Sequence, residues 1–157
     1  MTGDISSFKI NTPYILLTPG CAPQHSQKRW PAQSYAALAQ EILKQGITPV
    51  IIGTKAEEKE AQTIQEIAPK TINLVEQTSL AQIVSLSKNA VAAVGNDTGP
   101  MHLIGASGCP SLVLFSKNSN PIRHKPKGKC VEALQRDNLA DLDVKTVLES
   151  MNAIMQQ

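Results

Sequence analysis

The sequence predicts an α/β fold: a single Rossmann-like domain in which helices cover both faces of a doubly wound parallel sheet. Short apolar runs bounded by turn residues alternate along the chain with longer segments whose apolar residues recur at helical spacing. The apolar runs are continuous rather than alternating, as expected of strands that are buried on both faces. The length of 157 residues, with 41% hydrophobic and 18% charged residues, fits one folded domain.

The predicted elements follow one another in regular order. The strands are short apolar runs at residues 14–18, 48–52, 71–74, 90–94, 111–115 and, more weakly, 130–134. The helices begin near a proline, an acidic residue or a capping residue, at residues 31–45, 56–68, 79–88, 100–107 and 143–155. Residues 1–13 are predicted to be a flexible lead-in and residues 14–157 to be the domain.

Composition excludes several classes of protein. A net charge of +2, with two Phe, two Tyr and one Trp, argues against a nucleic-acid binder, which needs basic surface and aromatic stacking platforms. The three cysteines, Cys21, Cys109 and Cys130, are far apart and have neither disulfide-framework nor zinc-site spacing. No signal peptide or apolar stretch of membrane-spanning length is evident. We therefore expect a cytoplasmic domain without a metal site.

The strongest functional signal follows the fourth predicted strand, where the sequence reads GNDTGPMH. Ligands of open parallel sheets bind at the carboxyl ends of the strands. Asp97, Thr98 and Gly99 lie at such an end, and Pro100 begins a helix, so its N–H groups and dipole could hold a pyrophosphate. The alternative is simple helix capping by Asp97 or Thr98, with His102 as a partly buried packing residue.

The loop after the first strand supplies cations to the same edge of the sheet. It reads PGCAPQHSQKRWP, and it places Lys28 and Arg29 just before a helix N-terminus, which suits a phosphate. The alternative is that both are solvated charges and that Trp30 is a packing anchor. His25 is a single histidine in a loop, where histidines are usually just exposed, so we assign it no catalytic role. Two anion-friendly loops that converge on one edge favour a ligand over either alternative.

Two further segments carry charge. Glu57 and Glu58 follow the second strand, where a carboxylate could accept hydrogen bonds from ribose hydroxyls; compensation of the helix dipole is the alternative. Spacing does not decide between the two glutamates, although Glu57 is preferred. The basic run at residues 123–129 is an accessory candidate that could contact phosphates or an anionic lipid; a solvated charged face is the alternative. Walker, GxGxxG, HExxH and GxSxG motifs are absent from the sequence.

Several motifs together resemble the C-terminal domain of glycosyltransferase family 9, which includes the ADP-heptose:lipopolysaccharide heptosyltransferases. They are PGC followed by KRWP, GTKAEE, QTSLAQIVSL and GNDTGPMHLIGASGCPSLVLF, and they span about residues 14–115. The resemblance implies half of a GT-B enzyme, in which two Rossmann-like domains enclose the active site and the C-terminal one binds the nucleotide-sugar donor. The donor implied is ADP-heptose, used in lipopolysaccharide core biosynthesis without a metal cofactor.

The resemblance also implies a role for each motif residue. Lys28 would contact donor phosphate and Glu57 the ribose, while Thr98 and Gly99 would meet the pyrophosphate. Asp97 and His102 would line the sugar, and the segment beginning at Thr78 would lie near the base. These roles agree with the physical interpretation, because donors at a helix end stabilise charge on a leaving diphosphate.

The resemblance places the catalytic base, an aspartate, in an N-terminal acceptor-binding domain. Only thirteen residues precede Tyr14 here, so no catalytic residue is predicted in this chain, and alone it is expected to bind donor without completing the inverting transfer. The expected partners are a nucleotide sugar, a separately encoded or missing acceptor domain, and a lipid-linked saccharide, which would bring the protein to the inner membrane as a peripheral component.

The turn after the last core strand departs from the family pattern. It reads Ser-Lys-Asn-Ser at residues 116–119 instead of a Gly-Pro-Thr type of turn, so donor contacts of the family type are not expected there. Two other functions compete with a donor-binding half: a non-catalytic nucleotide-binding or assembly module, and half of a nucleotide-sugar epimerase.

Overall fold

The fold is a six-stranded parallel sheet in the order β3-β2-β1-β4-β5-β6. The computed structural model describes residues 4–8, 10, 13–20, 30–96, 98–116 and 131–156. The strands are β1 (Tyr14–Thr18), β2 (Thr48–Ile51), β3 (Ile72–Asn73), β4 (Ala92–Asn96), β5 (Ser111–Phe115) and β6 (Val131–Gln135). The strand order reverses between β1 and β4, which confirms the predicted doubly wound Rossmann-like sheet.

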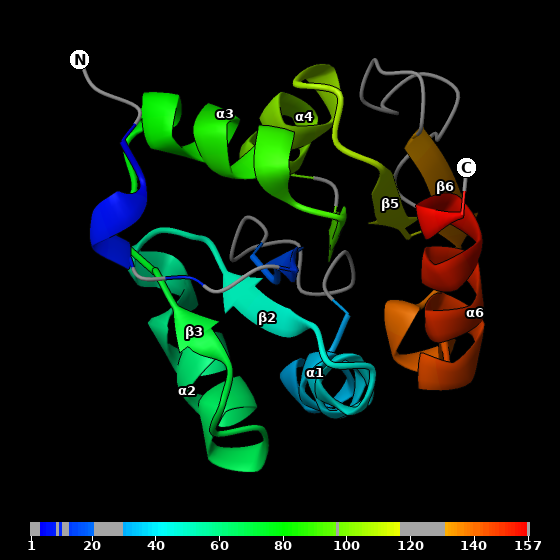
Figure 1. Cartoon of the computed structure of the whole chain (residues 1–157). Coiled ribbons are helices and arrows are strands. Elements are labelled where there is room, and N and C mark those ends of the chain that lie inside the picture. Colours follow the sequence, from blue (N-terminus) through cyan, green and yellow to red (C-terminus); the bar gives the residue numbers. More distant parts are fainter. Residues whose placement is uncertain are drawn as a thin grey trace.

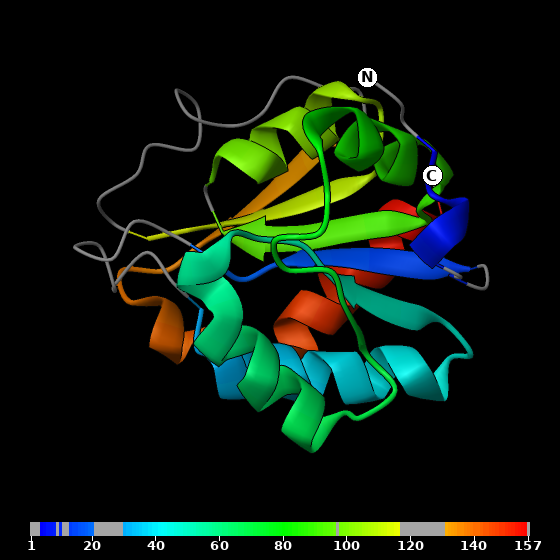
Figure 2. The ribbon, with the colours of Figure 1, turned by 90° about the vertical axis from the view of Figure 1, so that its left-hand side faces the viewer.

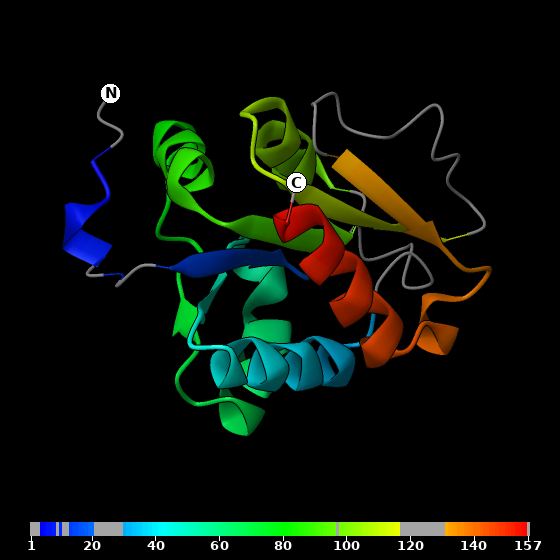
Figure 3. The same ribbon diagram turned by 45° about the vertical axis from the view of Figure 1, so that its right-hand side comes forward.

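Helices cover both faces of the sheet (Figures 1 and 2). They are α1 (Ala32–Lys44), α2 (Glu58–Ile67), α3 (Leu80–Asn89), α4 (Gly99–Ala106) and α6 (Val144–Met155). Residues of α1, α2 and α6 share one core cluster with the sheet, and residues of α3 and α4 share the other. Figure 3 shows α6 and α1 lying together on their common face. The strands β1, β4 and β5 are therefore buried on both sides.

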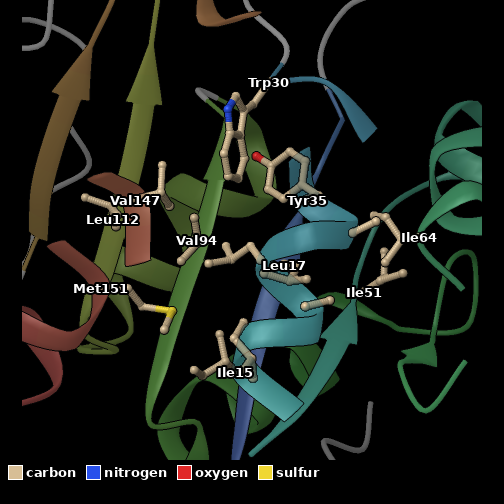
Figure 4. Packing of buried hydrophobic residues seen from close by; sticks show 14 of the residues in the cluster. Ile15, Leu17, Trp30, Tyr35, Ile51, Ile64, Val94, Leu112, Val147 and Met151 are labelled. Carbon is tan, nitrogen blue, oxygen red and sulfur yellow. The ribbon is translucent and has the colours of Figure 1, made fainter. Parts of the chain in front are cut away.

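The alternation of side chains along β1 builds the two layers of core. Ile15 and Leu17 point into the cluster with α1, α2 and α6, whereas Tyr14 and Leu16 point into the cluster with α3 and α4. All four side chains are at most 2% exposed. Figure 4 shows the first of these layers, with Trp30 at one end of it. A strand buried on both faces needs a continuous apolar run, as the sequence has.

Most element boundaries differ by one or two residues from the prediction. The fourth strand, predicted at residues 90–94, lies at Ala92–Asn96, because α3 continues to Asn89 and Ala90 is its C-cap. The second helix begins with a separate 3-10 turn, Lys55–Glu57, which is capped by Thr54. Two other 3-10 turns, Ser6–Phe8 and Leu139–Asp141, were not predicted. The shift of β4 matters for the site, since it places two more motif residues inside the sheet.

Part of the predicted lead-in is described. Ile5, Phe8 and Ile10 are partly buried and pack against the core cluster of α3 and α4. The side-chain amide of Gln82, in α3, donates to the Asp4 carbonyl at 3.1 Å. The segment therefore contacts the same face of the domain as α3. No helix among the described residues is long and apolar enough to span a membrane.

Candidate nucleotide-binding site

The sequence motifs meet at the carboxyl edge of the sheet, around the switch point between β1 and β4. These neighbouring strands pair in parallel, and Thr18 lies opposite Gly95 at their carboxyl ends. Gly95 has no room for a side chain, since a Cβ there would overlap Thr18 Oγ1 and lie 3.0 Å from Met101 Sδ. Thr18 Oγ1 also donates to Met101 Sδ at 3.4 Å. This close packing holds the first turn of α4 over the switch point.

The first turn of α4 contains a backbone donor at an exposed residue, Gly99. Thr98 is the N-cap, and its Oγ1 accepts from the Met101 N–H at 3.3 Å. Pro100 has no N–H, so the Gly99 N–H is the first-turn donor that this cap does not use. Gly99 is exposed, and a Cβ there would have no atom within 4 Å. Open space, a donor and the positive end of a helix dipole together suit a phosphate group.

Capping and phosphate binding are compatible at Thr98. Its Oγ1 uses a lone pair to accept from Met101, so the hydroxyl hydrogen is available to donate to a ligand. His102, one turn into α4, is partly buried, and its N–H donates to the Thr98 carbonyl at 3.1 Å. The structure thus shows the capping that the sequence offered as an alternative, in a geometry that leaves a donor for a ligand.

Glu57 joins the loops that follow β1 and β2. Its Oε2 accepts from Thr54 Oγ1 at 3.1 Å, and its Oε1 accepts from the Thr54 N–H at 3.4 Å. The Glu57 carboxylate lies so close to Gly20 that a side chain at position 20 would overlap it. A Cβ atom added at Gly53 would lie 3.1 Å from the Cβ of Glu57. Glu58 is exposed in the first turn of α2. Of the two candidate carboxylates, Glu57 is the one that lies against the loop after β1.

Asn96, the last residue of β4, connects these parts from within the core, and sequence reasoning missed it. Its fully buried side chain accepts from the Trp30 N–H at 3.1 Å and from the Tyr35 hydroxyl at 2.9 Å. It donates to the carbonyls of Pro19 at 2.9 Å and Gly20 at 3.3 Å. Every hydrogen-bonding position of the amide is used. The only available signal was its place in the GNDTGPMH motif.

Comparison with known proteins identifies the family of the chain. The sequence matches the model of glycosyltransferase family 9 (heptosyltransferase) over residues 3–151. The chain belongs to this family. It is 30% identical over 173 residues to lipopolysaccharide heptosyltransferase 2 of Escherichia coli, covering 96% of this chain and 49% of that relative. It is 28% identical to lipooligosaccharide heptosyltransferase 2 of Haemophilus influenzae, covering 91% of this chain and 47% of that relative.

A solved structure of the family has the same fold. The E. coli ADP-heptose lipopolysaccharide heptosyltransferase II superposes with a TM-score of 0.87 and 28% identity, covering 97% of this chain and 50% of the other. The predicted family and its GT-B half-fold are thereby confirmed. The chain spans about half the length of the curated relatives it matches.

The remaining family-9 motif residues fall into two groups. Thr78 is partly buried in the loop after β3, which reaches the same edge because the Glu76 N–H donates to the Gly53 carbonyl at 2.9 Å. Lys28 and Asp97, as well as the basic run at residues 123–129, lie outside the described residues. The structure thus brings Glu57, Thr78, Thr98, Gly99 and His102 to one end of this family-9 domain.

Two other features of the family-9 domain bear on ligands. A groove of about 430 Å³ lies between the C-terminal ends of α1 and α2, at the opposite edge of the sheet, and is lined by Gln40, Leu43, Lys44, Ile67, Ala68, Pro69 and Lys70. It contains none of the motif residues. In the described part of the chain, no group of three or more His, Cys, Asp or Glu side chains is placed to hold a metal ion.

Proposed function

We propose that this chain is the donor-binding half of a heptosyltransferase of lipopolysaccharide core biosynthesis, and that its donor is ADP-heptose. The observation that carries the proposal is that the open first turn of α4, at Gly99, and the Glu57 carboxylate follow strands that end at the same edge of the sheet. A diphosphate and a ribose need these two kinds of group. The relative with the same fold at 28% identity is named an ADP-heptose lipopolysaccharide heptosyltransferase.

The proposed task of this half is to stabilise the leaving diphosphate. In an inverting transfer, an acceptor hydroxyl attacks the anomeric carbon from the face opposite the nucleotide, and negative charge accumulates on the diphosphate. The Gly99 N–H, the Thr98 hydroxyl, the α4 dipole and the Lys28 ammonium would meet that charge. Donors that are fixed before the reaction favour the transition state over the ground state.

The other components of the reaction are assigned to a second domain. The base that deprotonates the acceptor and the site for a lipid-linked saccharide would come from an N-terminal acceptor domain, as the family resemblance implies. Asp97 and His102 would line the sugar, and Thr78 would lie near the base of the nucleotide. The acceptor would bring the assembled enzyme to the inner membrane surface.

The test is calorimetric titration of the chain with ADP, UDP and ADP-heptose. We expect binding of ADP and ADP-heptose and weaker binding of UDP. Lys28→Ala and Thr98→Ala should each weaken ADP binding about tenfold or more, as loss of a charge-assisted hydrogen bond does. Thr98→Ser keeps both the cap and the hydroxyl, so it should retain affinity and serves as the matched control. Equal ADP affinity of the alanine variants and the wild type would contradict the proposal.

Metal independence is part of the same proposal. If Lys28 and the α4 terminus neutralise the diphosphate, ADP affinity should be the same in a chelator and in millimolar Mg²⁺. A large gain in affinity with Mg²⁺ would instead assign the neutralisation to the metal ion.

A further inference from the structure

The Asn96 amide has a fixed orientation within a closed hydrogen-bond network. The backbone N–H of Trp30 can only donate, so it must face Oδ1 of Asn96. The carbonyls of Pro19 and Gly20 can only accept, so they must face Nδ2. The Tyr35 hydroxyl donates to the same Oδ1. The side chain is fully buried, where an unmade hydrogen bond would be costly.

The partners of Asn96 lie on both sides of the loop that carries Lys28. Pro19 and Gly20 precede residues 21–29, and Trp30 follows them, so one side chain holds both ends of that loop. The backbone of Asn96 ends β4, two residues before the N-cap Thr98. Asn96 thus connects the backbone on either side of residues 21–29 to the end of the strand that leads to α4.

We propose that Asn96 is a positioning residue, which fixes Pro19 and Gly20, directly after β1, relative to the N-terminus of α4, where the diphosphate is assigned. It acts through Gly20 and Thr98 and does not touch the donor. The inference rests on the proposed function for the identity of the ligand. Gly20, which Asn96 holds, also lies against Glu57, so the same link extends to the carboxylate assigned to the ribose.

Asn96→Asp is the sharpest variant, because it keeps the shape and Oδ1 and replaces the donor Nδ2 by an acceptor facing two carbonyls. We expect ADP affinity to fall about tenfold at a temperature where the variant is fully folded. The matched control is Ser111→Ala, which removes a buried hydroxyl that donates to the Cys109 carbonyl at 2.8 Å, at the opposite end of the sheet. It should lower the Tm and leave ADP affinity unchanged.

A double-mutant cycle separates positioning from general destabilisation. If Asn96 acts by positioning the N-terminus of α4, then adding Asn96→Asp to Thr98→Ala should weaken ADP binding by less than about twofold, because the interaction it supports is already gone. Full additivity of the two changes would overturn the inference. Should Asn96→Asp fail to fold, Tyr35→Phe removes one of the four hydrogen bonds and should show the same non-additivity on a smaller scale.

Trp30 gives a readout that does not depend on nucleotide. It is the only tryptophan of the chain, its ring packs edge-on against Tyr35 with centroids 4.9 Å apart, and its Nε1–H donates to the Leu142 carbonyl at 2.8 Å. Figure 4 shows the two rings side by side. Asn96→Asp should increase acrylamide quenching of Trp30, and Ser111→Ala should not.

ADP titration and acrylamide quenching of Trp30 together distinguish a failure of the proposed function from a failure of the positioning role. Absence of ADP binding by the wild type, together with increased Trp30 quenching in Asn96→Asp, would overturn the proposed function and retain the structural link. Normal ADP binding by Asn96→Asp, with unchanged quenching, would overturn the positioning role and leave the proposed function standing.

Discussion

The carboxylate of Glu57 lies against the backbone of Gly20, so closely that a methyl group at position 20 would overlap it. The contact joins the loop after β1 to the 3-10 turn that precedes α2. Thr54 holds the carboxylate there through its backbone N–H and its hydroxyl. Glycine at position 20 is therefore what allows a carboxylate to stand beside the loop that leads to Lys28.

Gly20→Ala should displace Glu57 without unfolding the domain. The overlapping atoms are the far end of a flexible side chain, which can rotate away at the cost of its bonds to Thr54. We expect a Tm within a few degrees of the wild type and ADP affinity reduced several-fold, by calorimetry. Unchanged affinity would show that the Glu57 carboxylate has no part in binding.

Glu57 and Glu58 provide a matched pair for the ribose contact. Glu57→Gln should weaken ADP binding and reduce the preference for ADP over 2′,3′-dideoxy-ADP, because an amide accepts hydrogen bonds from hydroxyls less strongly than a carboxylate. Glu58→Gln, one residue away and exposed, should leave both affinities unchanged. The reverse pattern would assign the ribose to Glu58.

Gly99→Ala should lower ADP affinity without lowering the stability of the domain. The added Cβ meets no atom within 4 Å, and alanine is favoured over glycine in a helix by up to about 1 kcal/mol, so the Tm should be unchanged or higher. The same methyl group would occupy the space assigned to the diphosphate, and ADP affinity should fall. An alanine variant that binds ADP normally would place the phosphates elsewhere.

The local pattern of the sequence predicts the sheet and its helices well because β1 and β5 are continuous apolar runs between clear turn residues. It misplaces β4 because Ala90 and Val91 are also small and apolar, and only pairing with β1, which sets Ile15 opposite Ala92, decides where the strand begins. Three-residue 3-10 turns carry too little periodicity to be predicted.

The site is predictable to the extent that its groups are local. The three consecutive residues Thr98, Gly99 and Pro100 predict a helix N-terminus. The role of Asn96 is not local, since its partners Trp30, Tyr35, Pro19 and Gly20 lie 61 to 77 positions away, and no periodicity marks a buried polar network of that kind.

The stability of the domain should fall at alkaline pH. Burial of the hydroxyl, and secondarily the nearby Cys109, raises the pKa of Tyr14 from 10.0 to about 12, and burial raises the pKa of Cys109 from 9.0 to about 12. Between about pH 9 and pH 12 the unfolded chain releases protons that the folded chain retains, so the free energy of unfolding decreases as pH rises.

Urea titrations at pH 8, and at a pH between the ordinary pKa of Tyr14, 10.0, and its raised pKa of about 12, measure this effect. A Tyr14→Phe, Cys109→Ala double variant should be less stable at pH 8, since the Tyr14 hydroxyl donates to the Leu86 carbonyl at 2.6 Å, but it should lose less stability as the pH rises. Equal losses in both proteins would show that neither group titrates as its burial requires.

The most direct test of the central claim is to map ADP onto the chain by amide chemical-shift changes during a titration. If the domain binds its donor at the switch point, the changes should concentrate at Gly20, Glu57 and Gly99, with none in the groove near Gln40 and Lys70. Shift changes confined to that groove, or none at saturating ADP, would contradict the assignment of this domain as the donor-binding half.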